Sequence, residues 1–211
     1  MENAAMGMSW MEILKTSIVM PVLLVLSVSI LAQALERVWM FWLLETMPHF
    51  LWRKVQRLIQ SGETEDAAQL CQGKSGTVAE ALTAIFQRAS GGAEEMMEAY
   101  QIHRQKFQLR LARRLGLFGT VSFIAPLIGL LGTVLGVMRA FHDLARAGTG
   151  GPAVVAAGIS DALVATAAGI GVAVLAAVFY NYFTLSLKYR LNLLDLWASQ
   201  LVDLLQKRRV P

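Results

Sequence analysis

The sequence predicts an all-α integral membrane protein with three transmembrane helices and long helical extensions. Hydrophobic residues make up 55% of the 211 residues and charged residues only 16%, which leaves too little polar surface for a soluble domain of this size. The charges also avoid three long runs, residues 16–35, 115–138 and 162–187. Each run reaches about 20 residues or more, enough for a helix to cross the ~30 Å hydrocarbon core of a bilayer. A buried core helix can imitate one such run, but three in so short a chain favour membrane spans.

The first apolar run has a second interpretation, a cleaved signal peptide. Its apolar region is too long for one, and its amino-terminal flank carries Glu2, Glu12 and only Lys15, so a positively charged region is missing. We therefore expect a retained span.

The distribution of basic residues indicates a topology. A net charge of +4 and a pI of about 9.5 would also suit a nucleic-acid-binding protein. However, eleven of the 19 Lys and Arg residues lie between Glu36 and Arg114 and five lie from Lys188 onward. In a three-span chain these two segments share one side, which the positive-inside rule assigns to the cytoplasm. We expect the amino terminus outside, the carboxyl terminus in the cytoplasm and no nucleic-acid partner.

Six segments follow from these spans. They are an N-terminal segment with the first transmembrane helix at 1–37, a cytoplasmic helical loop domain at 38–114, the second transmembrane helix at 115–139, a short periplasmic loop at 140–158, the third transmembrane helix at 159–187, and a cytoplasmic C-terminal helix at 188–211.

Helices are also predicted outside the spans. Short amphipathic patterns over residues 51–60, 64–71 and 78–89 are separated by glycine-containing breaks. Residues 93–114 contain good helix formers with neither Gly nor Pro after the start, so we expect one helix to continue unbroken into the second span. Residues 185–206 keep apolar side chains at helical spacing, which predicts a similar extension of the third span.

Signals of enzyme chemistry are absent from the sequence. Cys71 is the only cysteine, which excludes an intrachain disulfide and a thiolate metal cluster. The Gly-Lys-Ser at Gly73 lacks the upstream glycine of a phosphate-binding loop, and neither a nucleophile elbow nor a His-Glu-x-x-His motif occurs. We predict that the chain is not an enzyme and holds neither a metal nor another cofactor.

Small residues and two threonines mark the second and third spans. Gly129, Gly132 and Gly136 fall at i, i+3 and i+7, which places them on one helix face where another helix can approach closely. Thr133 lies beside that face. The third span carries a matching strip: Ala162, Ala165, Thr166, Gly169, Ala173 and Ala176. Plain helix packing, with each hydroxyl bonded to a carbonyl of its own helix, is one interpretation. A shared lining of small and polar residues is the other.

Asp161 lies at the start of the third span. It is either an interfacial residue of the first helical turn or, if it lies deeper, a functional carboxylate, because a charge inside a membrane is costly. Asp161 and Thr166 are five positions apart, which is roughly 140° around an ideal helix, so they need not share a face.

These motifs resemble a known family. Ala-Pro-Leu-Ile-Gly-Leu-Leu-Gly-Thr-Val-Leu-Gly, followed by Gly-Ile-Ser-Asp-Ala-Leu-Val-Ala-Thr-Ala-Ala-Gly, is similar to the MotA/TolQ/ExbB proton-channel family, and the resemblance extends over residues 117–183. It implies a multi-pass protein of the bacterial inner membrane that forms a pentamer around a pore. Two single-span helices of an ExbD/TolR-like subunit would occupy the pore, Thr133 and Thr166 would line it, and a TonB- or TolA-like energy transducer would be a further partner. The family often has Glu where this chain has Asp161.

The residues give an independent reason for a partner. Protons need ionisable groups or water to cross hydrocarbon, and the central parts of all three spans contain no Asp, Glu, Lys, Arg or His. A Thr hydroxyl does not titrate near neutral pH, so the carboxylate must come from another subunit. Bulky residues in the first span favour a position outside the second and third, facing lipid.

Two classes of function follow. One is a stator subunit of a motor whose coupling ion is the proton, of the ExbB, TolQ or gliding-motility type, with sodium as an open alternative. The other is a membrane scaffold without ion conduction.

Overall fold

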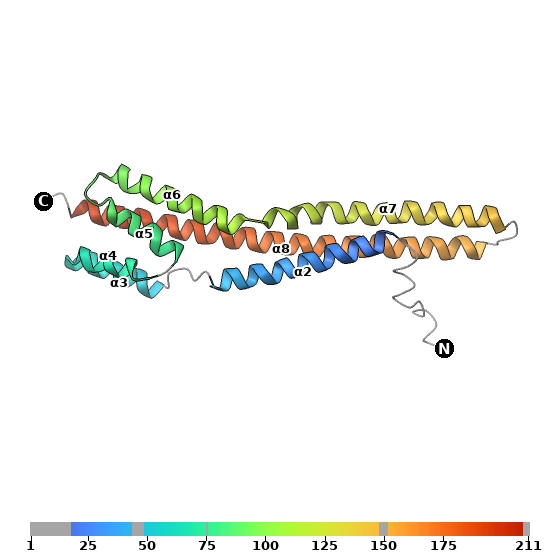
Figure 1. Ribbon diagram of the computed structural model, residues 1–211, viewed down its shortest axis with the longest axis horizontal. Helices are drawn as coiled ribbons and strands as arrows, with labels where there is room; N and C mark the ends of the chain where they lie inside the picture. Colours follow the sequence, from blue (N-terminus) through green and yellow to red (C-terminus); the bar gives the residue numbers. More distant parts are fainter. Residues whose placement is uncertain (1–17, 44–48, 75, 148–151, 209–211) are drawn as a thin grey trace. The chain divides into compact units, whose positions relative to one another are not determined.

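The computed structural model describes residues 18–43, 49–74, 76–147 and 152–208, and these ranges are almost entirely helical with no β-strand. In chain order the helices are α2 (Val19–Leu43), α3 (His49–Ser61), α4 (Thr64–Gln72), α5 (Thr77–Gln87), α6 (Ala93–Ala112), α7 (Leu115–Ala147) and α8 (Pro152–Lys207) (Figure 1). Three helical stretches are long and apolar enough to cross a membrane: Val19–Phe41, Ala93–Arg146 and Val155–Lys207, the second of which is interrupted between α6 and α7. The predicted all-α fold with three candidate spans is confirmed, while the orientation of the termini stays a prediction.

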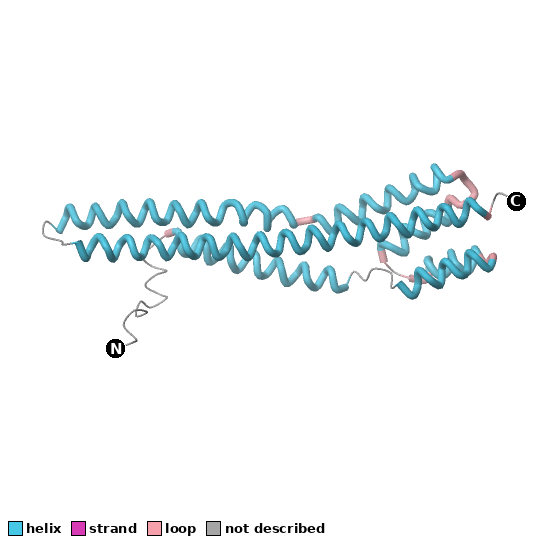
Figure 2. Tube along the Cα trace, turned by 180° about the vertical axis from the view of Figure 1, so that it is seen from behind, coloured by secondary structure: helices cyan, strands magenta, loops and turns pink. Residues whose placement is uncertain are grey.

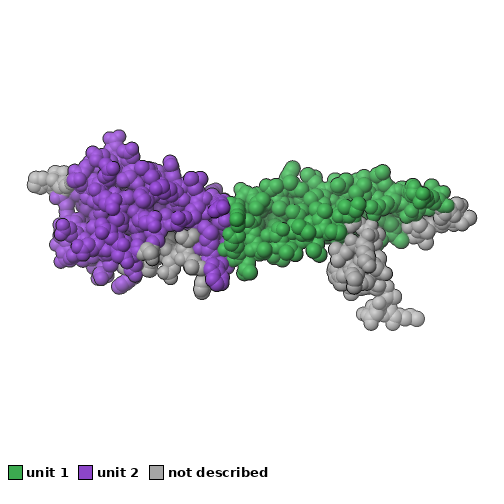
Figure 3. Space-filling model, viewed as in Figure 1, with its two compact units in different colours: residues 1–36, 114–182 green, residues 37–113, 183–211 purple. Residues whose placement is uncertain are grey.

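The chain forms two compact units (Figure 3). Unit 1 comprises residues 1–36 and 114–182, so it contains most of α2, all of α7 and the first part of α8. Unit 2 comprises residues 37–113 and 183–211 and contains α3 to α6 with the last part of α8.

Unit 1 is built on the antiparallel pair of α7 and α8, which lie side by side (Figures 1 and 2). The residues buried between helices are mostly alanines: Ala34, Ala125, Ala140, Ala162, Ala165, Ala173 and Ala176. Near one end of the pair Phe118 and Phe179 meet, with ring centroids 6.0 Å apart. Larger apolar side chains point outward from all three helices of the unit, among them Val25, Val28, Leu127, Leu130, Leu131, Ile170, Val174 and Val178. Small residues between the helices and large apolar residues on the outside suit helices surrounded by lipid or by other membrane helices rather than by water.

The predicted loop at 140–158 is largely helical. Helix α7 continues to Ala147 and α8 begins at Pro152, while residues 148–151 lie outside the described ranges. Residues 139–147 contain no helix breaker. Proline suits the first position of a helix because an N–H at that position would have no partner within the helix. Both helices therefore extend past the bounds that the charge pattern predicted for the spans.

The predicted unbroken helix from residue 93 into the second span is wrong. Arg113 and Arg114 separate α6 from α7, and Arg114 has a φ of 65°, in the left-handed region that residues other than glycine rarely adopt. The Nη1 atom of Arg114 donates to both carboxylate oxygens of Glu36, at 3.2 and 3.0 Å. This ion pair ties the residue at the break to α2, 78 positions away in the sequence.

A buried arginine caps the end of α6. Arg37 is 1% exposed, and its Nη1 atom donates to the carbonyl oxygen of Leu111 at 3.2 Å. The last four carbonyls of a helix have no partner within it, so this bond satisfies one of the groups that the end of α6 leaves free. The end of α6 contains neither Gly nor Pro, and a distant segment supplies a hydrogen-bond donor for its last turn.

Unit 2 packs its short helices around α6 and the last part of α8. Trp52 of α3 stacks on Trp197 of α8, with ring centroids 5.6 Å apart. The fully buried Leu82 and Ile85 place one face of α5 in the core, next to α6. Helices α3, α4 and α5 confirm the three predicted short helices, and α8 confirms the predicted extension of the third span.

Candidate functional site

The closest contact in unit 1 joins the glycines of α7 to the small residues of α8. A Cβ atom added at Gly129 would lie 3.0 Å from the Cα of Thr166, and one added at Gly169 would lie 2.6 Å from the carbonyl oxygen of Ala125. A Cβ at Gly136 would lie 2.6 Å from the Cβ of Ala162. These distances are shorter than carbon contacts tolerate, so the two backbones meet only because the side chains are missing.

Gly132 extends this contact to a third helix. A Cβ at Gly132 would lie 2.8 Å from the Cβ of Ala165 in α8 and 3.2 Å from the Cγ1 of Val19 in α2. The structure therefore places all four glycines singled out in the sequence, Gly129, Gly132, Gly136 and Gly169, where α7 meets its neighbours.

Thr166 forms a hydrogen bond between the two helices. Its Oγ1 atom donates to the carbonyl oxygen of Gly129 at 3.0 Å, and the side chain is half-buried. The carbonyl is within reach because neither Gly129 nor Gly169 has a side chain to hold the helices apart. Hydrogen bonds of this kind between membrane helices contribute roughly 0.6 to 2 kcal/mol.

Thr133 has a different partner. Its Oγ1 atom donates to the carbonyl oxygen of Leu130, in its own helix, at 2.6 Å. This is the local arrangement that plain packing predicts for a helical threonine. Both hydroxyl protons are thus engaged within the chain, and what each oxygen still offers is its acceptor lone pairs.

Asp161 lies well inside α8. The helix begins at Pro152, so Asp161 is more than two turns from the start of α8 and not in its first turn, while its place at the membrane interface stays a prediction. Its side chain is half-buried and forms no hydrogen bond or ion pair with any residue in the described ranges. The following residue, Ala162, packs against Gly136, and the hydrogen-bond partners of the two threonine hydroxyls are carbonyl oxygens and not Asp161.

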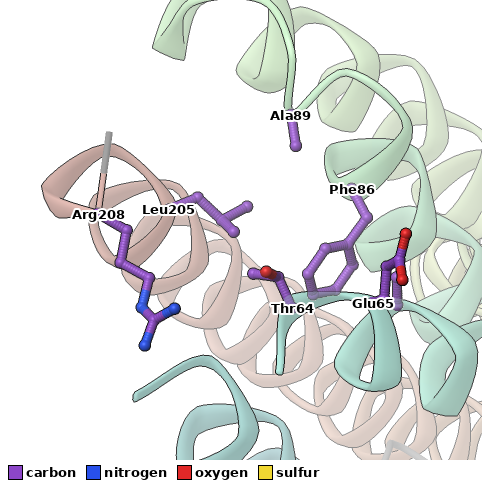
Figure 4. Close-up of a pocket in the computed structure, with 7 residues that line it drawn as sticks. Thr64, Glu65, Phe86, Ala89, Leu205 and Arg208 are labelled. Carbon is purple, nitrogen blue, oxygen red and sulfur yellow. The ribbon is translucent and has the colours of Figure 1, made fainter. Parts of the chain in front are cut away.

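Within the described ranges no group of three or more His, Cys, Asp and Glu side chains is close enough to hold a metal ion. Unit 2 has a pocket of about 560 Å³, in which Thr64, Phe86 and Leu205 turn toward the middle (Figure 4). Its other lining residues are Glu65, Ala68, Ala89 and Arg208. Arg208 already donates to the carbonyl oxygen of Gln60 at 3.0 Å, and the lining offers no pair of groups for acid–base chemistry.

Sequence reasoning missed one polar cluster, in unit 2. Asp195 of α8 accepts hydrogen bonds from Arg104 of α6 at two oxygens, with Nε–Oδ1 at 2.6 Å and Nη2–Oδ2 at 2.9 Å, and it accepts a third from the hydroxyl of Tyr100. The partners are 91 and 95 positions apart in the sequence. The only local signal is the i, i+4 spacing of Tyr100 and Arg104, which places both on one face of α6.

This cluster shifts the pKa values of its members. Burial opposes ionisation of Asp195, but the hydrogen bonds from Arg104 and Tyr100 and the charge of Arg104 outweigh it, so the pKa of the carboxyl is lowered. Burial and the hydrogen bond to Asp195 raise the pKa of Tyr100. The cluster therefore holds a carboxylate, a guanidinium and a neutral phenol, and it fastens α6 to α8 outside the charge-free apolar runs.

Comparisons with known proteins place these features in a family context. Residues 56–195 match the model of a family described as the MotA/TolQ/ExbB proton channel family. The chain is similar to a biopolymer transport protein ExbB of Salmonella typhimurium, with 42% identity over 46% of this chain and 40% of that protein. A putative ExbB-like biopolymer transport protein of Synechocystis is 35% identical over 81% of this chain and 68% of its own length. The Tol-Pal system protein TolQ of Pseudomonas aeruginosa is 36% identical over 43% of this chain and 39% of its own. The chain thus spans less than half the length of the Salmonella and Pseudomonas proteins.

Proposed function

The chain belongs to the MotA/TolQ/ExbB proton channel family, and we propose that it is the channel-forming subunit of an ExbB/ExbD- or TolQ/TolR-like motor. In this proposal five copies form a ring in the bacterial inner membrane, and two copies of an ExbD/TolR-like single-span subunit occupy its centre. Proton flow through the ring moves that subunit and energises a TonB- or TolA-like partner in the periplasm. The names of the relatives, biopolymer transport and Tol-Pal proteins, support a transport-energising membrane subunit rather than an enzyme.

One observation carries the proposal: polar oxygens lie in two charge-free runs, which contain no titratable carboxyl, amine or imidazole. Residues 115–138 and 162–187 include no Asp, Glu, Lys, Arg or His, yet Thr133 and Thr166 lie within them, near Gly129. Protons do not cross such a surface without a group that binds and releases them. A carboxyl group on a partner helix beside these threonines completes the path.

The hydrogen bonds that the two threonine hydroxyls already donate limit what they can bind. Because Thr133 and Thr166 donate their protons to backbone carbonyls, their oxygens act toward a partner only as acceptors. A protonated carboxylic acid can donate to such an oxygen, whereas an ionised carboxylate cannot. The threonines therefore favour the protonated partner, which is the form able to turn through an apolar ring at the lowest desolvation cost.

The distribution of charge supports the proposed orientation. Unit 2 contains most of the Lys and Arg residues, so the positive-inside rule places it in the cytoplasm, with the α7–α8 end on the periplasmic side. Asp161 would then lie toward the periplasmic end of the path, where a carboxylate can collect protons from water.

Valine and serine substitutions test the role of the threonines. Thr166→Val keeps the volume nearly constant and removes the hydroxyl, and we expect intact oligomers with about fivefold lower proton flux, because losing a hydrogen bond to the neutral carboxylic acid costs on the order of 1 kcal/mol. Thr166→Ser should retain most of the flux. The measurement is proton uptake into vesicles that contain the ExbD/TolR-like subunit.

Thr120 provides a matched control. It lies in the same unit on the exposed side of α7, and its hydroxyl also bonds a carbonyl of its own helix, that of Gly116, at 3.0 Å. Thr120→Val should leave the flux unchanged. Full flux in both Thr133→Val and Thr166→Val would refute the pore assignment and favour the scaffold function, for which the local bond of Thr133 is the supporting observation. Repeating the assay with sodium in place of a proton gradient identifies the coupling ion, and a gliding-type motility stator remains the alternative within the family.

A further inference from the structure

Unit 2 exposes two helix faces of opposite charge. Helix α3 presents Arg53, Lys54 and Arg57 together with Phe50, whose side chain is 68% exposed. A basic face with an apolar residue at one end is thus free on α3, because the opposite face, with Trp52 and Ile59, is buried.

Helix α6 presents the complementary face. Glu94 and Glu98 are exposed, one helical turn apart, and Ile102 follows on the same side with 51% of its side chain exposed. Within the described ranges none of the five charged side chains on the two faces forms an ion pair or a hydrogen bond. Neither face is therefore used inside the chain.

Two contacts between α3 and α8 fix the height of the basic face along the axis of α8. Trp52 stacks on Trp197, and the Nε2 atom of Gln56 donates to Oε1 of Gln200 at 3.5 Å, so α3 and α8 run in the same direction. With the same rise per residue in both helices, residues 53–57 lie about level with residues 198–202 of α8.

The acidic face lies at the same level. Tyr100 bonds Asp195, and α6 runs opposite to α8 (Figure 1). Residues 94–98 of α6 are therefore about level with residues 197–201 of α8. The apolar residues of the two faces also lie at a common height, since Phe50 and Ile102 are both near the height of Asp195. In Figures 1 and 2, α3 and α6 lie on opposite sides of the last part of α8.

Rotational symmetry requires that two faces in contact around a ring lie at the same height, as the α3 and α6 faces do along α8. In a ring of identical subunits each contact joins two different faces, and rotation about the axis leaves the height of every residue unchanged. Two faces meet around a ring whose axis follows α8 only if they lie at the same height. The α3 and α6 faces meet that condition and add opposite charge, which favours the correct register. We propose that the α3 face of one copy docks on the α6 face of the next copy. This inference rests on the proposed assembly of several copies.

Cross-linking between differently tagged full-length copies tests the contact. One copy carries Arg57→Cys and the other carries Glu94→Cys, and both are expressed in the same membranes. We expect a cross-linked product that contains both tags. The control pair replaces Arg57→Cys with Glu80→Cys, because Glu80 is exposed on α5 and belongs to neither face. The native Cys71 is 0% exposed and stays in place, with the unsubstituted chain as its control.

Charge reversal provides a second measurement. Glu94→Lys with Glu98→Lys should weaken association about tenfold at low salt, and adding Arg53→Glu with Arg57→Glu in the same chain should restore it. This contact is overturned if the two tagged copies give no mixed cross-link, or if the second charge reversal gives no rescue, while native mass spectrometry still shows an oligomer. Either result leaves the proposed function standing. A monomeric native mass for the unsubstituted chain would overturn both.

Discussion

Two glycines of α8 offer a sharp test of the close contact in unit 1. Gly169 and Gly171 are two positions apart in one helix, yet their surroundings differ. A Cβ at Gly169 would lie 2.6 Å from the Ala125 carbonyl oxygen and 2.9 Å from the Gly129 Cα, whereas nothing lies within 4 Å of a Cβ at Gly171. Alanine at each position therefore makes the same chemical change in a crowded and in an open site.

The expected energies follow from these distances. At Gly169→Ala both nearest atoms belong to the backbone, so α7 and α8 must separate by roughly 0.5 to 1 Å to reach ordinary carbon contact. Overpacking of this kind costs about 1–3 kcal/mol, and the separation also weakens the bond from Thr166 to Gly129. Alanine regains up to about 1 kcal/mol of helix propensity, which leaves about 1 kcal/mol at the midpoint of that range, and the weakened hydrogen bond adds about 1 kcal/mol, for a net loss of about 2 kcal/mol. Gly171→Ala keeps the propensity gain alone.

Thermal unfolding of the purified protein in detergent measures both variants. By the usual scaling for a chain of this size, Gly169→Ala should lower Tm by about 4–8 °C, while Gly171→Ala should leave it unchanged or raise it by a few degrees. Equal Tm values for the two variants would refute the close contact, since propensity acts equally on both. A fall in Tm for Gly171→Ala alone would indicate that the face of α8 with Gly171, and not the face with Gly169, packs against α7.

Other regions give further predictions. Asp195→Asn should destabilise unit 2 by about 1 kcal/mol, a value reduced for the partial exposure of the ion pair. Because the folded pKa of Asp195 is lowered, its stabilisation is complete above the unfolded value of about 3.9 and is lost as pH falls through the folded pKa, so acid titration of unfolding should show a loss that the Asn variant lacks. Burial raises the pKa of Cys71 to about 11, so alkylation at pH 8 should be slow in the folded protein and fast in denaturant, and rapid labelling of the native chain would contradict that burial. Gly132→Leu should disrupt packing against Ala165 and Val19, and native mass measurement together with Tm would show whether assembly survives.

The sequence alone determined the all-α fold, the three candidate spans and the family. These features follow from local patterns: long charge-free runs, helical spacing of apolar residues, and the glycine and alanine strips that begin at Gly129 and Ala162. Helix bounds outside the spans were also predictable within one or two residues for α3 and α4, because glycine-containing breaks mark their ends.

Tertiary structure decided what depends on partners far apart in the chain. The break between α6 and α7 has no local signal, since it rests on Arg37 and Glu36 reaching Leu111 and Arg114. The two threonines look alike in sequence, yet Thr133 bonds its own helix while Thr166 bonds the backbone of α7. That difference arises because a hydroxyl takes the nearest free acceptor, and only the approach of two glycine-containing helices brings the carbonyl of Gly129 within reach of Thr166.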